Sequence, residues 1–213
     1  MYKTRSEKLT ALQDYMNLET GRIKESSFIW ENTLYEKALR KKLLDSRILR
    51  CTKCPGLNIA RFTEACPGWG NLNADVFFIG QSLHKPGVRS GLPFIGGSGY
   101  MIDAALRLSG LLRHEVYFWN TVLCHPANNR ASTSEEKENC FPYLREVISI
   151  VQPKMIIALG NDAKEAVGKL SGWSEDPPRT LCIRHPASFS YSEPESRYLW
   201  IVKLSLEIDK VLK

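Results

Sequence analysis

The sequence has no run of about 18 consecutive apolar residues, the shortest length that spans a membrane as a helix. Its opening residues, Met-Tyr-Lys-Thr-Arg-Ser-Glu-Lys, lack the apolar core of a signal peptide. It also has no internal repeat and no low-complexity segment. These absences argue against the membrane and secreted classes, so we expect a cytosolic protein that does not insert into membranes.

Cysteine is scarce, with six residues among 213. Because a reducing compartment keeps thiols free, we expect these cysteines to bind a metal or to be buried rather than to form disulfides. Charge of one sign does not dominate either, since 29 basic and 23 acidic residues give a net charge of +6. This excess favours a polyanionic partner without requiring one, because many solvated surfaces carry as much.

Apolar segments alternate with amphipathic ones from about residue 75 onward. Strands are predicted at 75–80, 115–120, 154–160 and 179–184, and helices at 99–112, 134–151, 162–170, 195–212 and, earlier, from about 27 towards 51. Strands separated by helices predict an α/β fold, here a three-layer α/β/α sandwich around a mainly parallel four-stranded sheet. We divide the chain into a helical extension, residues 1–45, and a sheet domain, residues 46–213.

The segment from Gly80 to Phe94 connects the first predicted strand to a helix. It contains five Gly or Pro residues, so its backbone can approach a ligand closely, and it contains no carboxylate. In open α/β sheets, ligands bind where strands end and such loops begin. The sequence therefore predicts a ligand site at the carboxyl edge of the sheet.

Two further polar residues follow predicted strands. The amide of Asn120 can offer a donor and an acceptor to the edge of a planar ligand such as a pyrimidine. The imidazole of His185 can donate to a carbonyl that gains negative charge. Either residue alone is more often structural, and only their common position at strand ends favours a site.

Four cysteines have a spacing that suits metal binding: Cys51 and Cys54 form a C-x2-C pair, and Cys124 and Cys140 follow. Four thiolates bind zinc or an iron–sulfur cluster. A zinc ribbon usually has two close pairs, whereas fifteen residues separate the second pair here, which favours a cluster and leaves zinc open. Cys66 and Cys182 lack such partners, and we expect both to be small apolar fillers.

A series of motifs runs in order through residues 45–192: Cys51-x2-Cys54, Gly70-x-x-Asn-Ala-Asp, Phe78-Ile-Gly80, Gly91-x-Pro-Phe94-x-Gly96, Val116-Tyr-x-x-Asn120, Cys124-x-Pro126-x-x-Asn129-Arg130, Pro153-Lys-x-Ile-Ile157 and His185-Pro186-Ala187. Together they resemble the family-4, iron–sulfur uracil-DNA glycosylases. The run Asn120-Thr-Val-Leu123 is also similar to the family-1 enzymes. The resemblance implies DNA as the partner and hydrolysis of the N-glycosidic bond of a base flipped out of the helix.

The resemblance also implies roles for individual residues. Phe94 would stack on the flipped base, Asn120 would read its edge, and His185 would stabilise the departing base anion. Asn129 is similar to a family position near the attacking water. A 4Fe-4S cluster in a small lobe would be held by Cys51, Cys54, Cys124 and Cys140.

The loop after the first strand departs from the family pattern. Family-4 enzymes typically read Gly-Glu-Ala-Pro-Gly followed by an acidic run, whereas this chain has Gln81-Ser-Leu-His-Lys-Pro-Gly87. A carboxylate assists hydrolysis through an oxocarbenium-like sugar, and this loop has none. We therefore assign the positioning of water to Ser82 or Asn129. Substrate binding is assigned to Gln81 and His84. A roomier, less negative loop predicts a pyrimidine enlarged at C5, as in bacteriophage DNA, and hence a defence role. Excision of plain uracil in base excision repair is the alternative.

Contact with DNA is assigned to the basic Lys85, Arg89 and Arg130, with Phe189 or Tyr191 filling the vacated stack. Three other functions stay open: a module that binds a modified base without cleaving it, a covalent trap that uses His84, and a redox protein with a cycling cluster. We expect the protein to be a monomer.

Overall fold

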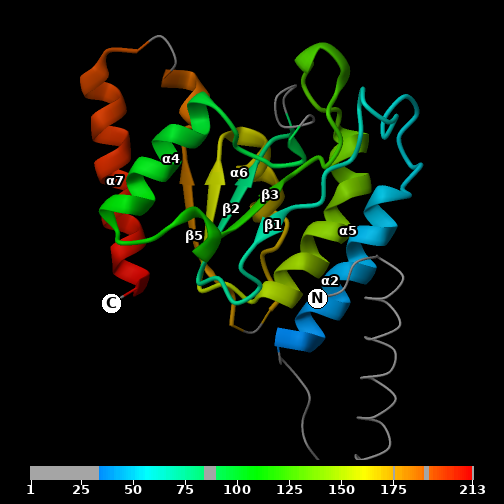
Figure 1. Cartoon of the computed structure of the whole chain (residues 1–213), viewed down its shortest axis with the longest axis horizontal. Helices are drawn as coiled ribbons and strands as arrows, with labels where there is room; N and C mark the ends of the chain where they lie inside the picture. Colours follow the sequence, from blue (N-terminus) through cyan, green and yellow to red (C-terminus); the bar gives the residue numbers. More distant parts are fainter. Residues whose placement is uncertain (1–33, 84–89, 175, 190–191, 213) are drawn as a thin grey trace, which may run out of the picture. The chain divides into compact units, whose positions relative to one another are not determined.

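The computed structural model describes residues 34–83, 90–174, 176–189 and 192–212. One sheet with the strand order β1-β3-β2-β4-β5 lies at its centre (Figure 1). The strands are β1 (Trp69–Gly70), β2 (Val76–Gly80), β3 (Tyr117–Asn120), β4 (Met155–Leu159) and β5 (Arg179–Ile183). Strands β2 to β5 are parallel, and β1 pairs antiparallel with β3. The four predicted strands are confirmed. Strand β1 is a fifth, which the sequence analysis did not predict because two residues are too few to show a strand pattern.

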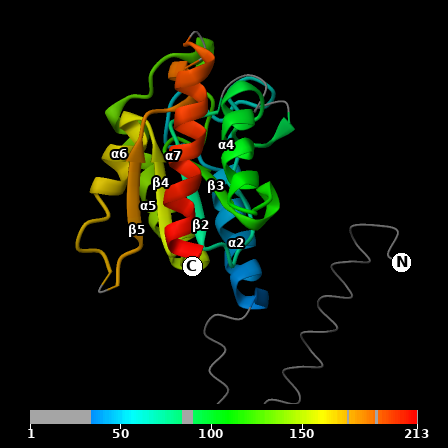
Figure 2. The same ribbon diagram turned by 90° about the vertical axis from the view of Figure 1, so that its left-hand side faces the viewer.

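Helices cover both faces of the sheet, which confirms the predicted three layers. Helices α4 and α7 lie on one face and α2, α5 and α6 on the other (Figures 1 and 2). Their bounds are α2 (Leu34–Leu49), α4 (Gly97–Leu108), α5 (Ser134–Val151), α6 (Asn161–Gly168) and α7 (Pro194–Leu212), with short 3-10 helices η1 (Arg113–Glu115), η2 (Ala127–Asn129) and η3 (Pro186–Phe189). None of the helices in these described ranges has the length and hydropathy of a membrane span.

The central strands are buried on both sides, and successive residues contribute to opposite cores. In β2, Phe77 and Ile79 face the core under α2 and α5, while Val76 and Phe78 face the core under α4 and α7. This alternation fixes the register, because a shift by one residue would exchange the two sets of side chains. Gly80 is thereby held opposite Asn120 at the carboxyl edge.

Helix α2 belongs to the same compact unit as the sheet, and this unit comprises residues 32–213. Leu44 and Ile48 are fully buried, and the ammonium of Lys37 donates to the carbonyl of Val151 at 3.1 Å. The predicted division after residue 45 stays a prediction, since residues 1–33 lie outside the described part of the chain.

Candidate active site

The ends of β2 and β3 bring an amide and an aromatic ring together. A Cβ atom at Gly80 would lie 2.7 Å from Oδ1 of Asn120 and 2.6 Å from the ring of Phe94. Only glycine leaves room for both groups over the strand end. Asn120 is 5% exposed, so its amide is almost completely shielded from solvent. Two residues that the sequence assigned to base binding therefore meet at one point.

Phe94 lies close to His185 although the two are far apart in the chain. Their ring centroids are 6.3 Å apart and the rings are inclined by 27°. The Phe94 ring is buried, and its other neighbour is Phe118 of β3, at 5.6 Å between centroids. Phe94 also has a left-handed backbone, with φ of 57°, which is uncommon for a bulky residue.

The backbone after β5 fixes the tautomer of His185. The N–H of Ala187 donates to Nδ1 of the imidazole at 3.1 Å, so a neutral ring carries its proton on Nε2. Both the N–H and the hydroxyl of Ser188 donate to the carbonyl of His185, at 3.0 and 2.8 Å. His185 is thus held as an Nε2–H donor, which suits it to stabilise developing negative charge on an oxygen.

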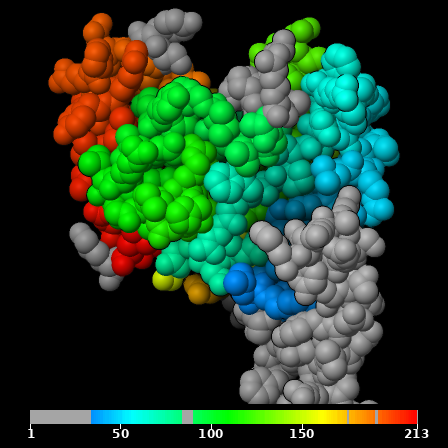
Figure 3. Space-filling view, viewed as in Figure 1, coloured from blue at the N-terminus to red at the C-terminus, as the bar shows by residue number. Residues whose placement is uncertain are grey.

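A cavity of about 380 Å³ opens between the ends of β2, β4 and β5. Figure 3 shows the molecule hollowed at this edge, between the start of α7 and the loop that follows β3. Polar and apolar groups both line it, from Gln81, Leu159, Gly160, Asn161, Asp162, Arg184, His185 and Ser188. Gln81 and His185, both predicted site residues, therefore share one cavity.

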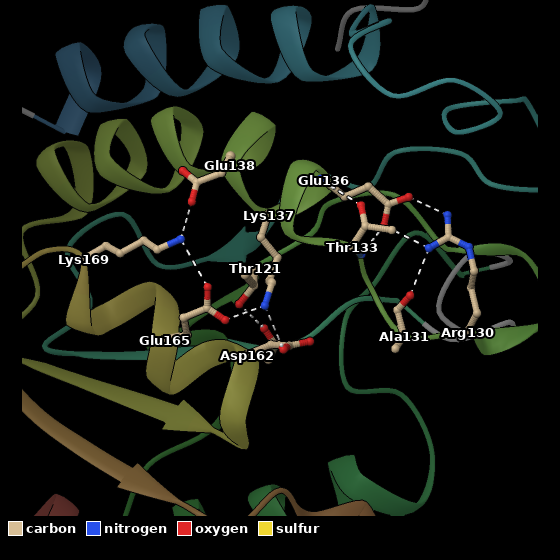
Figure 4. Close-up of polar contacts among 11 residues, drawn as sticks. Thr121, Arg130, Ala131, Thr133, Glu136, Lys137, Glu138, Asp162, Glu165 and Lys169 are labelled. Atoms are coloured by element: carbon tan, nitrogen blue, oxygen red, sulfur yellow. Dashed lines mark hydrogen bonds and ion pairs between the residues drawn. The ribbon is translucent and has the colours of Figure 1, made fainter.

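The cavity wall includes a carboxylate that sequence reasoning missed. Asp162 lies in the first turn of α6, and its Oδ1 is 3.4 Å from the ammonium of Lys137, which also pairs with Glu165 (Figure 4). Asp162 lies outside the loop after β2, where the family pattern predicts the carboxylate. The position of Asp162 directly after β4 was the available signal, because parallel strands end at one edge.

The two residues assigned to water positioning lie in different settings. Ser82 is half-buried, two residues beyond Gly80. Asn129 is exposed, with φ of 53°, and is not among the residues that line the cavity. A residue that the sequence analysis did not identify, the buried His125, anchors the start of the loop through Nδ1, 2.7 Å from the carbonyl of Leu83. His84, Lys85, Arg89 and Tyr191 lie outside the described residues.

Arg130, assigned to DNA contact, is held at the start of α5. Its guanidinium contacts both carboxylate oxygens of Glu136, which also caps the helix together with Thr133 (Figure 4). The hydrogen bond from Arg130 lowers the pKa of the Glu136 carboxyl. The side chain of Arg130 remains 44% exposed, so a fixed cation is available at the surface.

Phe189, which the sequence analysis assigns to filling the vacated base stack, packs into one of the two cores of the structure. Its side chain is 9% exposed and belongs to the core under α4 and α7. The ring contacts Trp200, and the guanidinium of Arg184 covers it at 4.8 Å. The apolar face of α7 provides this buried position, and the role of Phe189 in the vacated stack stays a prediction.

The four cysteines assigned to a cluster converge from three segments. Cys124 and Cys140 are buried, and Cys51 and Cys54 are half-buried. Burial raises the pKa of the Cys124 thiol to about 12, and the neighbouring Cys140, Cys51 and Cys54 raise it as well. Within the described ranges, no group of three His, Cys, Asp or Glu side chains has a ready-made metal-binding geometry. The donor chemistry nevertheless fits an iron–sulfur cluster, because four thiols from distant segments gather at one place.

The two remaining cysteines differ from each other. Cys66 is buried, as predicted, and its thiol is 2.9 Å from the carbonyl of Gly91. The prediction is wrong for Cys182, which is exposed because β5 is an edge strand with little cover.

The amino-acid sequence is similar to those of several known proteins. The chain is 36% identical over 130 residues to the Type-4 uracil-DNA glycosylase of Thermotoga maritima, covering 61% of this chain and 67% of the relative. It is 36% identical over 129 residues to the Pyrobaculum aerophilum protein of the same name, covering 61% and 65%. The Saccharolobus solfataricus protein, also a Type-4 uracil-DNA glycosylase, is 31% identical over 176 residues, covering 74% and 80%. The chain thus spans about two thirds of the first two relatives.

The family model described as "Uracil DNA glycosylase superfamily" matches residues 67–205. This range contains all five strands and every described residue that lines the cavity. With more than half of its length matched in this way, the chain belongs to the uracil DNA glycosylase superfamily.

Proposed function

We propose that the protein is a DNA glycosylase that hydrolyses the N-glycosidic bond of a pyrimidine flipped out of DNA. The observation that carries this proposal is the meeting of Phe94, Asn120 and His185 at the carboxyl edge of the sheet. A stacking ring, a hydrogen-bonding amide and an Nε2–H donor are the groups needed to hold a planar base and to stabilise it as it departs.

In this mechanism, the bond between C1′ of the sugar and the base nitrogen breaks, and its electron pair goes to the base. The Nε2–H of His185 donates to the base oxygen on which negative charge develops. Water then adds its oxygen to C1′, and the proton that it loses is taken up through solvent by the departing base anion. The sugar passes through an oxocarbenium-like state, which a nearby carboxylate stabilises.

We propose that Asp162 supplies the carboxylate that the loop after β2 lacks. Asp162→Asn should slow single-turnover base release on the order of 10²-fold, because it removes the negative charge that would stabilise the sugar cation. The matched control is Glu165→Gln, which removes the other acidic partner of Lys137 but lies outside the cavity lining. Equal rates for the two variants would show that Asp162 takes no part, and would leave Ser82 or Asn129 to hold the water.

The substrate we favour is a pyrimidine enlarged at C5. The cavity beside Gln81 is also lined by the amide of Asn161, the guanidinium of Arg184 and the hydroxyl of Ser188, which suit a substituent that bears hydroxyl groups. Release rates for uracil, 5-hydroxymethyl and glucosylated pyrimidines in matched duplexes test this preference, with mass spectrometry of the released bases. We expect the enlarged bases to be released fastest. Release of uracil alone would refute the preference.

Excision of plain uracil is the second candidate function, and the names of the relatives favour it. The duplex series separates the two candidates, because they predict opposite rank orders. A retained base with a stable protein–DNA adduct on a denaturing gel would instead indicate a covalent trap.

Removal of enlarged pyrimidines would direct the enzyme against bacteriophage genomes that contain them. We therefore propose a role in defence against such phages. Efficiency of plating should fall for phages with modified DNA and not for phages with ordinary DNA, in cells that carry the wild-type protein. Cells that carry Asn120→Ala should not be protected, and equal plating in all these cells would exclude the role.

We further propose that Cys51, Cys54, Cys124 and Cys140 hold a 4Fe-4S cluster. The burial of two thiols and their approach to the C-x2-C pair support this assignment. When bound, the cluster would contribute stability and no electron transfer, since hydrolysis needs no redox step.

A further inference from the structure

Arg113 reaches from η1 back to the segment that carries Phe94. Its Nη2 donates to the carbonyl of Phe94 at 3.1 Å, and its Nη1 to the carbonyl of Pro93 at 3.4 Å. Nε donates to Oδ1 of Asp103 in α4 at 2.8 Å. One guanidinium thus joins two consecutive carbonyls to a carboxylate, because each of its three nitrogens donates one hydrogen bond.

The same guanidinium stacks on the aromatic cluster beneath Phe94. Its central carbon lies 4.9 Å from the ring centroid of Phe118, which in turn contacts the Phe94 ring. The Arg113 side chain is 21% exposed, so water competes little for these contacts. Arg113 therefore contacts Phe94 directly through its backbone and indirectly through Phe118.

The backbone that Arg113 holds is strained and closely surrounded. Phe94 has φ of 57°, a conformation that costs free energy for a bulky residue and persists only where its surroundings impose it. A Cβ atom at Gly99 would lie 1.9 Å from the carbonyl oxygen of Phe94 and 2.9 Å from Nη2 of Arg113. The carbonyl is therefore enclosed between α4 and the guanidinium, and the ring is directed over Gly80.

We propose that Arg113 is a positioning residue for base excision, which locks the Phe94 ring in the orientation that stacks on the flipped base. This inference rests on the proposed function, in which Phe94 is the stacking ring. Arg113 touches no reacting atom and acts through Phe94. Lysine cannot replace it, because an ammonium lacks the planar fork that joins Asp103 to the two carbonyls and stacks on Phe118.

Arg113→Lys is the decisive variant, because it keeps the charge and removes the fork. With uracil and 5-hydroxymethyluracil duplexes as probes, single-turnover base release should fall about 10- to 100-fold, as expected for a misplaced contact near the reacting bond. The dissociation constant for DNA should change less than about threefold, because phosphate contacts dominate binding. Arg107→Lys, an exposed change in the last turn of α4, is the matched control and should match the wild type.

A double-mutant cycle separates positioning from general destabilisation. If Arg113 acts through Phe94, then Phe94→Ala combined with Arg113→Lys should release bases no more slowly than Phe94→Ala alone. Multiplied losses in the double variant, or an Arg113→Lys protein as fast as the wild type, would overturn the proposal. Weaker DNA binding and lower thermal stability in proportion to slower release would do the same.

A crystal structure of the Arg113→Lys protein provides a readout that needs no activity. We expect Phe94 to leave the left-handed region and its ring to move from Gly80. An unchanged Phe94 would refute the positioning role, even if the wild-type protein released neither base. Absence of release by the wild type would itself count against the proposed function and not against the positioning of Phe94.

Discussion

Asn120→Ala is expected to slow base release about 10³-fold or more, with little change in folding or in DNA affinity. The amide lies in an almost dry position at the end of β3, directly over Gly80, where it can meet both a donor and an acceptor on a base edge. Removing one such preorganised group from an active site typically lowers the rate about 10²- to 10³-fold. The rate falls further when polar groups of the bound base are left without a hydrogen-bond partner. Single-turnover release from matched duplexes measures the effect.

Two further variants sharpen this experiment. Asn120→Asp keeps the shape but replaces the amide donor with an acceptor, so it should be almost as slow as Asn120→Ala. Asn73→Ala changes an exposed asparagine before β2 and should behave as the wild type. A rate for Asn120→Ala within about threefold of the wild type would remove this residue from the site.

Cys54→Ala is expected to abolish cluster assembly and to destabilise the fold by more than about 4 kcal/mol, the scale seen when a metal site is lost. The wild-type protein, purified without oxygen, should be brown and contain about four irons for each chain. The large effect follows from the connections that the cluster would make, because its ligands join the end of α2 to α5 and to the segment after β3. Iron analysis and denaturant unfolding measure both quantities.

The other two cysteines provide controls for this experiment. Cys66→Ala removes a buried thiol outside the proposed ligand set, and should keep the iron while costing about 1 kcal/mol. Cys182→Ala changes an exposed position on β5 and should keep both iron and stability. Zinc in place of iron in the wild type, or a stable and active Cys54→Ala protein without iron, would contradict the structural cluster.

The strands and the edge at which the site lies could be predicted because they depend on short-range patterns. Apolar runs such as residues 75–80 predict buried strands. Because parallel strands end at the same edge of a sheet, Gly80, Asn120 and His185 could be predicted to lie along one edge. Helix α5 begins at Ser134 as predicted, since Thr133 and Glu136 form a capping box that is visible in the sequence.

The parts that could not be predicted depend on contacts between distant segments. Nothing local to Arg113 shows that its guanidinium reaches Phe94, and nothing local to Asp162 shows that it shares a cavity with His185. The burial of Phe189 could not be predicted for the same reason, because it depends on Trp200 in α7. The sequence shows which residues follow a strand. The direction in which their side chains point depends on the helices that pack against the sheet, and the sequence does not show these contacts.

The strand order also has a kinetic consequence. The first long strand, β2, lies between β3 and β4, so neither of its neighbours is complete when it leaves the ribosome. Pairings between segments far apart in the chain form slowly, because loop closure must precede the contacts that compensate for it. His185 follows β5, which is the last strand in the chain and pairs with β4 at the edge of the sheet. We therefore expect the cavity to close late in folding, because a nascent chain that stops before β5 carries Asn120 but still lacks the imidazole of His185.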